Sequence, residues 1–259
     1  MKGTSIMKLN KLMPLAILTA LALQLSAQDY AFDHKKLAVK AVKGKEITAA
    51  LEKSAVLRLK EGGWATASAE RAKKTTVKNE KGVKTTVSVS NKFYTVEHVY
   101  QTFNGCPAVF VDLTLIPKTD LDSLSGSIPS LDTAANLVML TLPGREPLEL
   151  VVKKHKQYQL RTWAVLSDKD PAKPAVMYII PSLDLYDFSS GGNIAVGGFS
   201  RGYGWRPGME IHHPDFIRSK IEKGQKYQSR YITVPTTGNA DHAKVYQDVM
   251  KVYRANFGE

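Results

Sequence analysis

Residues 197–214, GGFSRGYGWRPGMEIHHP, concentrate side chains that can bind a ligand. Glycines let the backbone approach a ligand closely, aromatic rings stack on sugars or bases, and arginines pair with carboxylates or phosphates. The stretch therefore predicts a binding platform for an anionic polymer or acidic glycan, made by Phe199, Arg201, Tyr203, Trp205 and Arg206. In a single straight strand, the first four would share one face. The alternative is a tight turn whose aromatic rings fill the core.

The same stretch contains no nucleotide motif. Its GYGWRPG segment has neither the glycine spacing of the dinucleotide fingerprint nor the Gly-Lys-Ser/Thr ending of a phosphate loop. We therefore expect no nucleotide cofactor and no specific nucleic-acid partner.

Two adjacent histidines raise the question of a metal site. His212 and His213 would point to opposite faces of a strand, and zinc needs three or four converging ligands. Asp215 and His242 are further candidates, but no spacing requires them to converge. We predict no metal site, and a turn that leads into a helix beginning at Pro214.

One hairpin prediction supplies candidate catalytic residues. Asn104-Gly105 separates two alternating runs, which is a strong signal for a two-residue turn. That turn would place Glu97 opposite Asp112, as an acid/base pair, half of a metal site, or two solvated carboxylates. The same register puts Cys106 on the sheet face opposite His98, which favours an inert, buried thiol.

The N-terminus predicts export. Lys2, Lys8 and Lys11 precede an apolar run over 12–25, which ends near the small residue Ala27. This layout is typical of a secretory signal peptide spanning 1–27, and the run is shorter than the ~20 residues of a membrane-spanning helix. We expect a periplasmic or extracellular protein with no membrane span after cleavage.

Net charge and cysteine content indicate which partners the protein can attract and what stabilises it. The formal net charge is +12, and removing the three signal-region lysines leaves +9. A basic exported protein associates with anionic polymers, although net charge alone specifies no reaction. Its single cysteine cannot form an internal disulfide, so stability must come from the core.

The remaining pattern predicts a β-rich α+β fold with mainly antiparallel sheet. We expect an extended or partly disordered lead-in over 28–44 and one domain over 45–259, with a soft boundary at the polar connection 118–136. The residues 45–60 have helical spacing, with an alternative in which a helix ends near Ser54 and the sequence VLRL forms a strand.

Further elements follow from alternation and turn residues. A hairpin with a lysine-rich face is predicted around Asn79–Gly82. We expect strands over 137–142, 147–154, 158–166, 175–181 and 227–234, and a short helix over 214–224. A C-terminal helix is expected over 239–257, capped by Asn239 and Gly258.

These observations favour an exported protein that binds an anionic polymer or acidic glycan without catalysis. No nucleophile motif or zinc signature is present, so we do not expect an enzyme. Two alternatives stay open: a hydrolase of envelope polymers acting through a carboxylate pair, and a structural protein acting through protein contacts. The oligomeric state is not predicted.

Overall fold

A computed structural model describes 30–41, 46–50, 56–59, 63–66, 72–120, 124–133, 137–150, 157–181, 193–201, 204–213 and 222–258. The predicted signal peptide lies outside these residues, as does nearly all of the helix predicted at 214–224. No helix in the described ranges is long and apolar enough to cross a membrane.

The described strands form two nine-stranded sheets, and every strand pair is antiparallel. Sheet A has the order β1-β2-β3-β10-β17-β16-β13, with β4 paired to β10 and β5 paired to β4. Its strands are β1 Tyr30–Asp33, β2 Ala38–Ala41, β3 Glu46–Ala50, β4 Val56–Leu59, β5 Gly63–Thr66, β10 Leu124–Thr133, β13 Gln157–Gln159, β16 Asn193–Arg201 and β17 Gly204–His213.

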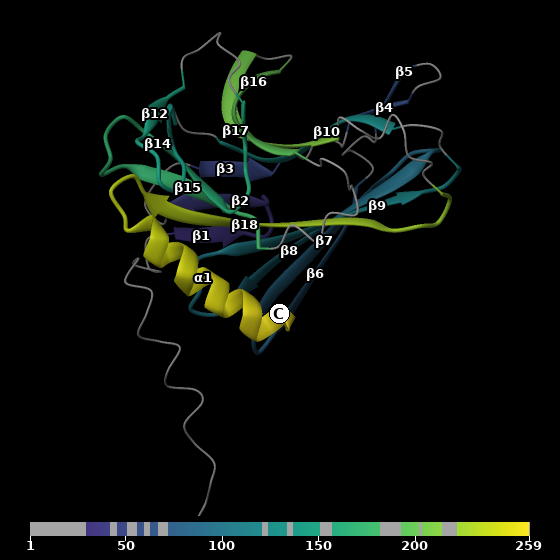
Figure 1. Ribbon diagram of the computed structural model, residues 1–259. Coiled ribbons are helices and arrows are strands. Elements are labelled where there is room, and N and C mark those ends of the chain that lie inside the picture. Colours follow the sequence, from purple (N-terminus) through teal and green to yellow (C-terminus); the bar gives the residue numbers. More distant parts are fainter. Residues whose placement is uncertain are drawn as a thin grey trace, which may run out of the picture.

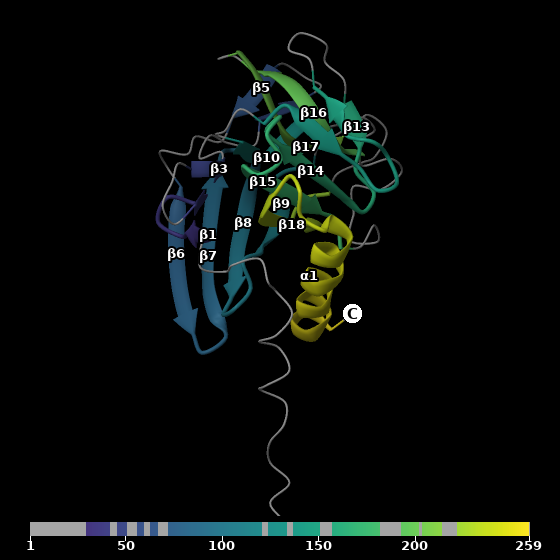
Figure 2. The same cartoon turned by 90° about the vertical axis from the view of Figure 1, so that its left-hand side faces the viewer.

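Sheet B has the order β12-β11-β14-β15-β18-β9-β8-β7-β6. Its strands are β6 Lys73–Asn79, β7 Gly82–Ser90, β8 Tyr94–Phe103, β9 Val109–Pro117, β11 Met139–Thr141, β12 Leu148–Glu149, β14 Trp163–Ser167, β15 Pro174–Ile179 and β18 Tyr227–Thr237. The single helix of the described residues, α1 His242–Phe257, lies on the face of sheet B that points away from sheet A (Figures 1 and 2). The predicted β-rich, mainly antiparallel fold is confirmed.

Sheet B is buried on two sides because its central strands carry apolar residues on both faces. One face, with Tyr94, Tyr100 and Val111, packs with Leu37 and Val39 of the first hairpin. The other face packs against α1 through a second cluster that includes Phe110, Met177, Ile232, Val249 and Tyr253. Burial on both faces explains why β15 is almost continuously apolar instead of alternating.

Helix α1 confirms the C-terminal prediction and corrects its cap. The Asp241 side chain accepts a hydrogen bond from the Lys244 backbone N–H at 3.0 Å, and Gly258 has a left-handed φ of 79°. Asn239 was expected to cap the helix, but its Oδ1 accepts a hydrogen bond from Thr237 Oγ1 at 2.8 Å instead.

Two predictions of local structure were wrong. The 45–60 segment forms β3 and β4 and contains no predicted helix in its described parts, because β3 pairs with β2 and β10 and these partners override the helical spacing. The alternative strand VLRL is confirmed as β4. The expected polar connection 118–136 contains β10, which pairs with three strands, β3, β4 and β17.

The first hairpin belongs to sheet A and also contacts sheet B. Its described part, β1 and β2, forms regular strands within the predicted lead-in. The His34 ring nitrogens Nδ1 and Nε2 lie 2.9 Å from Thr85 Oγ1 and 3.0 Å from Thr102 Oγ1, so the hairpin's turn is hydrogen-bonded to β7 and β8.

Candidate functional site

The predicted platform is a hairpin of sheet A. β16 and β17 pair Phe199 with Arg206, Ser200 with Trp205, and Arg201 with Gly204, so the chain reverses between Arg201 and Gly204. Paired residues occupy positions on one face of a sheet. Phe199, Arg201 and Arg206 therefore share one face by register, and Trp205 is on the other. The backbone therefore does not form the single straight strand in which Phe199, Arg201, Tyr203 and Trp205 would share one face.

Tyr203 lies outside the described residues. The assignment of ligand binding to this stretch stays a prediction.

The described candidate metal ligands lie in two elements, β17 and α1. His212 and His213 are the last two residues of β17, where His212 pairs with Ser127 and His213 with Gly126. His242 begins α1, and its Nε2 donates a hydrogen bond to the Thr237 carbonyl at 2.9 Å. Asp215 lies outside the described residues, and the described residues contain no group of three or more His, Cys, Asp or Glu suited to a metal ion.

The candidate carboxylates do not face each other. β8 and β9 pair Val99 with Asp112 and Glu97 with Thr114, two residues away from the predicted register. In the predicted register Phe103 and Cys106 would be a hydrogen-bonded pair, and Cys106 N does donate to the Phe103 carbonyl at 3.1 Å. The strand pairing nevertheless begins only at Thr102 and Val109, so the connection between β8 and β9 spans 104–108 instead of two residues.

Asp112 instead forms an ion pair with Arg230. Its Oδ1 accepts a hydrogen bond from Nε of Arg230 on the neighbouring strand β18. The same guanidinium donates through Nη1 to Tyr253 Oη at 3.2 Å and lies 4.3 Å from the centre of the Phe257 ring. Asp112 and Arg230 thus join sheet B to α1, and nothing in this contact favours acid/base catalysis.

Cys106 packs against the cluster under α1. Burial raises the pKa of its thiol to about 11, and the hydrogen bond from the Ala108 backbone N–H opposes this shift only in part. Because the thiolate is the reactive form of cysteine, the geometry agrees with an unreactive thiol.

We expect the folded protein to react slowly with a thiol-specific reagent at pH 8. A thiol with a pKa near 11 is ~0.1% thiolate at that pH, whereas in the unfolded chain an ordinary thiol is roughly a quarter ionised. Labelling should therefore accelerate by at least ~100-fold in denaturant. Rapid, complete labelling of the native protein would show that Cys106 is activated.

The described surface contains one concentrated group of basic side chains. We call β6 and β7 with their turn the basic hairpin. It has one acidic residue, Glu80, and five exposed lysines: Lys73, Lys74, Lys78, Lys81 and Lys84. Lys74 Nζ donates to the Lys35 carbonyl at 2.6 Å, and none of the five lysines forms an ion pair.

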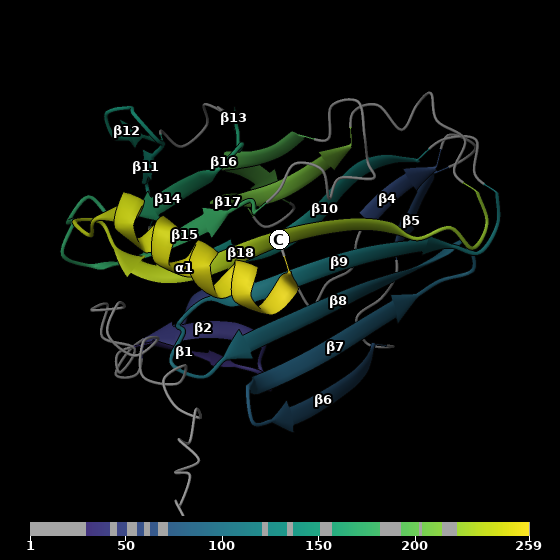
Figure 3. The same ribbon diagram turned by 60° about the horizontal axis from the view of Figure 1, so that its bottom comes forward.

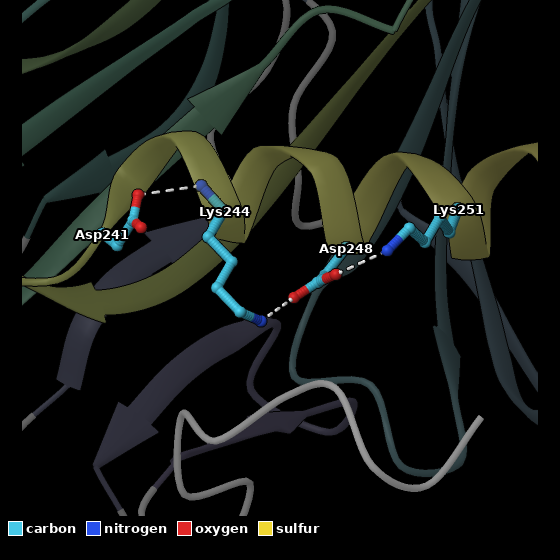
Figure 4. A network of polar contacts seen from close by, with 4 residues as sticks. All are labelled: Asp241, Lys244, Asp248 and Lys251. Carbon is cyan, nitrogen blue, oxygen red and sulfur yellow. Dashed lines mark hydrogen bonds and ion pairs between the residues drawn. The ribbon is translucent and has the colours of Figure 1, made fainter. Parts of the chain in front are cut away.

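Four lysines elsewhere in the described chain, Lys169, Lys173, Lys244 and Lys251, are paired with carboxylates. Lys169 lies 2.6 Å from Glu149, and Lys244 and Lys251 lie 2.7 Å and 3.1 Å from the two oxygens of Asp248 (Figure 4). Burial alone would raise the pKa of Asp248, but hydrogen bonds from the two ammonium groups lower it below its ordinary value. The basic hairpin therefore differs from these sites in having uncompensated positive charge.

Sequence reasoning found the lysine-rich hairpin, although the register places Lys74 and Lys78 on one face of the sheet and Lys73 and Lys84 on the other. It could not show that these charges are unpaired. Pairing depends on carboxylates that are distant in sequence, and no spacing signal reports them.

The fold of this chain is similar to a part of larger glycoside hydrolases. The GH36 α-galactosidase AgaA of Geobacillus stearothermophilus, in complex with 1-deoxygalactonojirimycin, matches 77% of this chain with 14% identity and a TM-score of 0.54. The α-N-acetylgalactosaminidase NagBb of Bifidobacterium bifidum, in its GalNAc complex, matches 88% with 13% identity and a TM-score of 0.51.

The matched regions are 32% and 37% of those enzymes, so the chain spans about a third of their length. At these identities the likeness shows a shared fold alone. No protein-family model matches the chain, and no curated protein does.

Proposed function

We propose that this protein is an exported, non-catalytic protein that binds an anionic polymer, with acidic glycans as the favoured class. The observation that carries the proposal is the basic hairpin, where five exposed lysines stand beside one glutamate without an ion pair. Exposed like charges raise the local potential and attract polyanions, and the attraction is screened over a Debye length of ~8 Å at physiological ionic strength.

Two further points support a glycan as the polymer. The structural neighbours with TM-scores of 0.50 or more include glycoside hydrolases solved with stachyose and with GalNAc. Phe199, Arg201, Tyr203, Trp205 and Arg206 supply the residue types that stack on sugars and pair with uronate carboxylates. The carboxylate pair of the hydrolase alternative is not supported, since Asp112 is paired with Arg230 and is not opposite Glu97.

Replacing Lys78 and Lys84 by Gln should weaken binding to a polyuronate and flatten its dependence on salt. At roughly 0.5–1 kcal/mol for each exposed lysine, the double variant should lose roughly 5- to 30-fold in affinity at low ionic strength. Binding is measured by titration calorimetry at several salt concentrations.

The matched control replaces Lys169 and Lys173 by Gln. This changes the net charge by the same amount, but these two lysines are paired with Glu149 and Asp168. Equal losses in both double variants would mean that net charge alone drives association and that the basic hairpin is no site. Replacing Arg201 and Arg206 by Gln tests the β16–β17 hairpin by the same measurement.

A further inference from the structure

β6 is one of the two edge strands of sheet B (Figure 3). It is bonded to β7 on one side and has no neighbouring strand among the described residues on the other. All seven of its residues are exposed, and Val77, at 56% exposure, is the one exposed large hydrophobic residue among those whose burial the structure describes. An exposed edge of this length presents unpaired backbone groups to which another chain can bond.

The register identifies the free backbone groups. Asn91 N donates to the Tyr94 carbonyl at 3.0 Å, which begins the β7–β8 ladder. Hydrogen-bonded pairs alternate in antiparallel sheet, so Val83, Thr85, Val87 and Val89 direct their backbone groups toward β8.

The intervening residues of β7, namely Lys84, Thr86 and Ser88, therefore bond to their partners on β6, which are Val77, Thr75 and Lys73. The N–H and C=O groups of Lys74, Thr76 and Lys78 are left to point outward, as three donors and three acceptors along the free edge.

The charges at this edge select the strand that can pair with it. A second copy of β6, paired antiparallel about Thr76, would place Lys74 opposite Lys78 twice, and like charges directly opposite destabilise a sheet. An acidic strand would instead place carboxylates beside those lysines, which lie four residues apart on one face, ~13 Å at the rise of a strand.

We propose that the free edge of β6 binds an extended acidic segment of a protein partner as an added strand. This goes beyond the proposed function, because an acidic glycan has no peptide ladder to pair with the edge. Backbone hydrogen bonds give such a complex its alignment, and the lysines restrict the partner to acidic sequences.

The test uses a synthetic peptide of alternating Thr and Glu, and two variants of the full-length protein. Thr76→Pro removes one outward N–H and fills its place with the proline ring, while the bonds to β7 remain, as proline permits in edge strands. Thr76→Val is the matched control, because both variants lose the 2.9 Å hydrogen bond between Thr76 Oγ1 and Thr85 Oγ1. We expect the proline variant to bind the peptide at least 10-fold more weakly, and the valine variant to bind within 2-fold of the wild type.

A second probe makes the result independent of folding in the proline variant. The same peptide with alternate backbone nitrogens methylated keeps its charge but cannot complete the ladder, so it should bind the wild type at least 10-fold more weakly. Equal binding of both peptides, or no binding of the unmodified peptide, would overturn the proposal. Polyuronate binding by the proline variant is measured in parallel, since it should be unchanged and its loss would bear on the proposed function instead.

Discussion

Tyr253→Ala should lower the free energy of unfolding by about 3–5 kcal/mol, the range for deleting a buried aromatic ring. Tyr253 is fully buried between α1 and sheet B, and its ring stacks on Phe257 at a centroid distance of 5.1 Å. Its hydroxyl accepts a hydrogen bond from Arg230, so the ring and the hydroxyl both attach the helix to the sheet. Urea unfolding followed by circular dichroism measures the loss.

Tyr253→Phe separates the two contributions. The ring and its packing remain, and the bond from Arg230 Nη1 is lost, so we expect a decrease of about 1 kcal/mol. If the alanine and phenylalanine variants were equally stable, the ring would contribute nothing and the interface between α1 and sheet B would be misassigned.

The strands of sheet B were largely predictable because their signals are local. Alternation in 94–103, the turn residues near Asn79 and Asn104, and the glycine after α1 all act within a few residues of the structure they specify. The β8–β9 register lies two residues from the predicted one because the connection over 104–108 is longer than the two-residue turn that Asn104-Gly105 signals. An even shift keeps every side chain on its face, so the predicted separation of His98 from Cys106 across the sheet survived the error.

β10 was not predictable from its own residues. Its sequence, LSGSIPSLDT, has short polar side chains and a central proline, which favour a loop. The strand forms because β17 pairs along it on one side, while β4 and β3 pair with its two halves on the other. Pro129, which has no N–H, falls between those halves and at the register shift with β17, so the ladder accommodates it there.

The candidate site shows the same division between local and distant information. The run of lysines in 73–84 is visible in the sequence, but the lack of ion pairs there depends on where every carboxylate of the folded chain lies. The contact of His34 with Thr85 and Thr102 joins residues 51 and 68 positions apart, and no periodicity reports it.

Acid should destabilise the fold by about 3 kcal/mol between pH 6.5 and 4 through His98 alone. Burial lowers the pKa of this imidazole from 6.5 to about 4, so the folded protein keeps it neutral where the unfolded chain binds a proton. The unfolded state is then favoured increasingly as the pH falls below 6.5, and the loss is complete once the pH passes below 4. Burial and the Lys74 ammonium also lower the pKa of His34, opposed in part by Asp33, which adds to the same trend.

His98→Phe tests the assignment, because it removes the titrating group and keeps a ring beside Tyr100, whose centroid lies 6.0 Å from that of His98. Loss of the hydrogen bond between His98 Nδ1 and Tyr100 Oη, 3.2 Å long, should cost stability equally at every pH in this range. The variant's free energy of unfolding, measured in urea at pH 7 and pH 4, should therefore fall by about 3 kcal/mol less than that of the wild type. Asp248, whose pKa is lowered by Lys244 and Lys251, also loses part of its stabilisation as the pH falls toward 4, but this loss is the same in both proteins and cancels in the comparison. An identical fall in both proteins would place the acid sensitivity in other groups and leave His98 without a part in it.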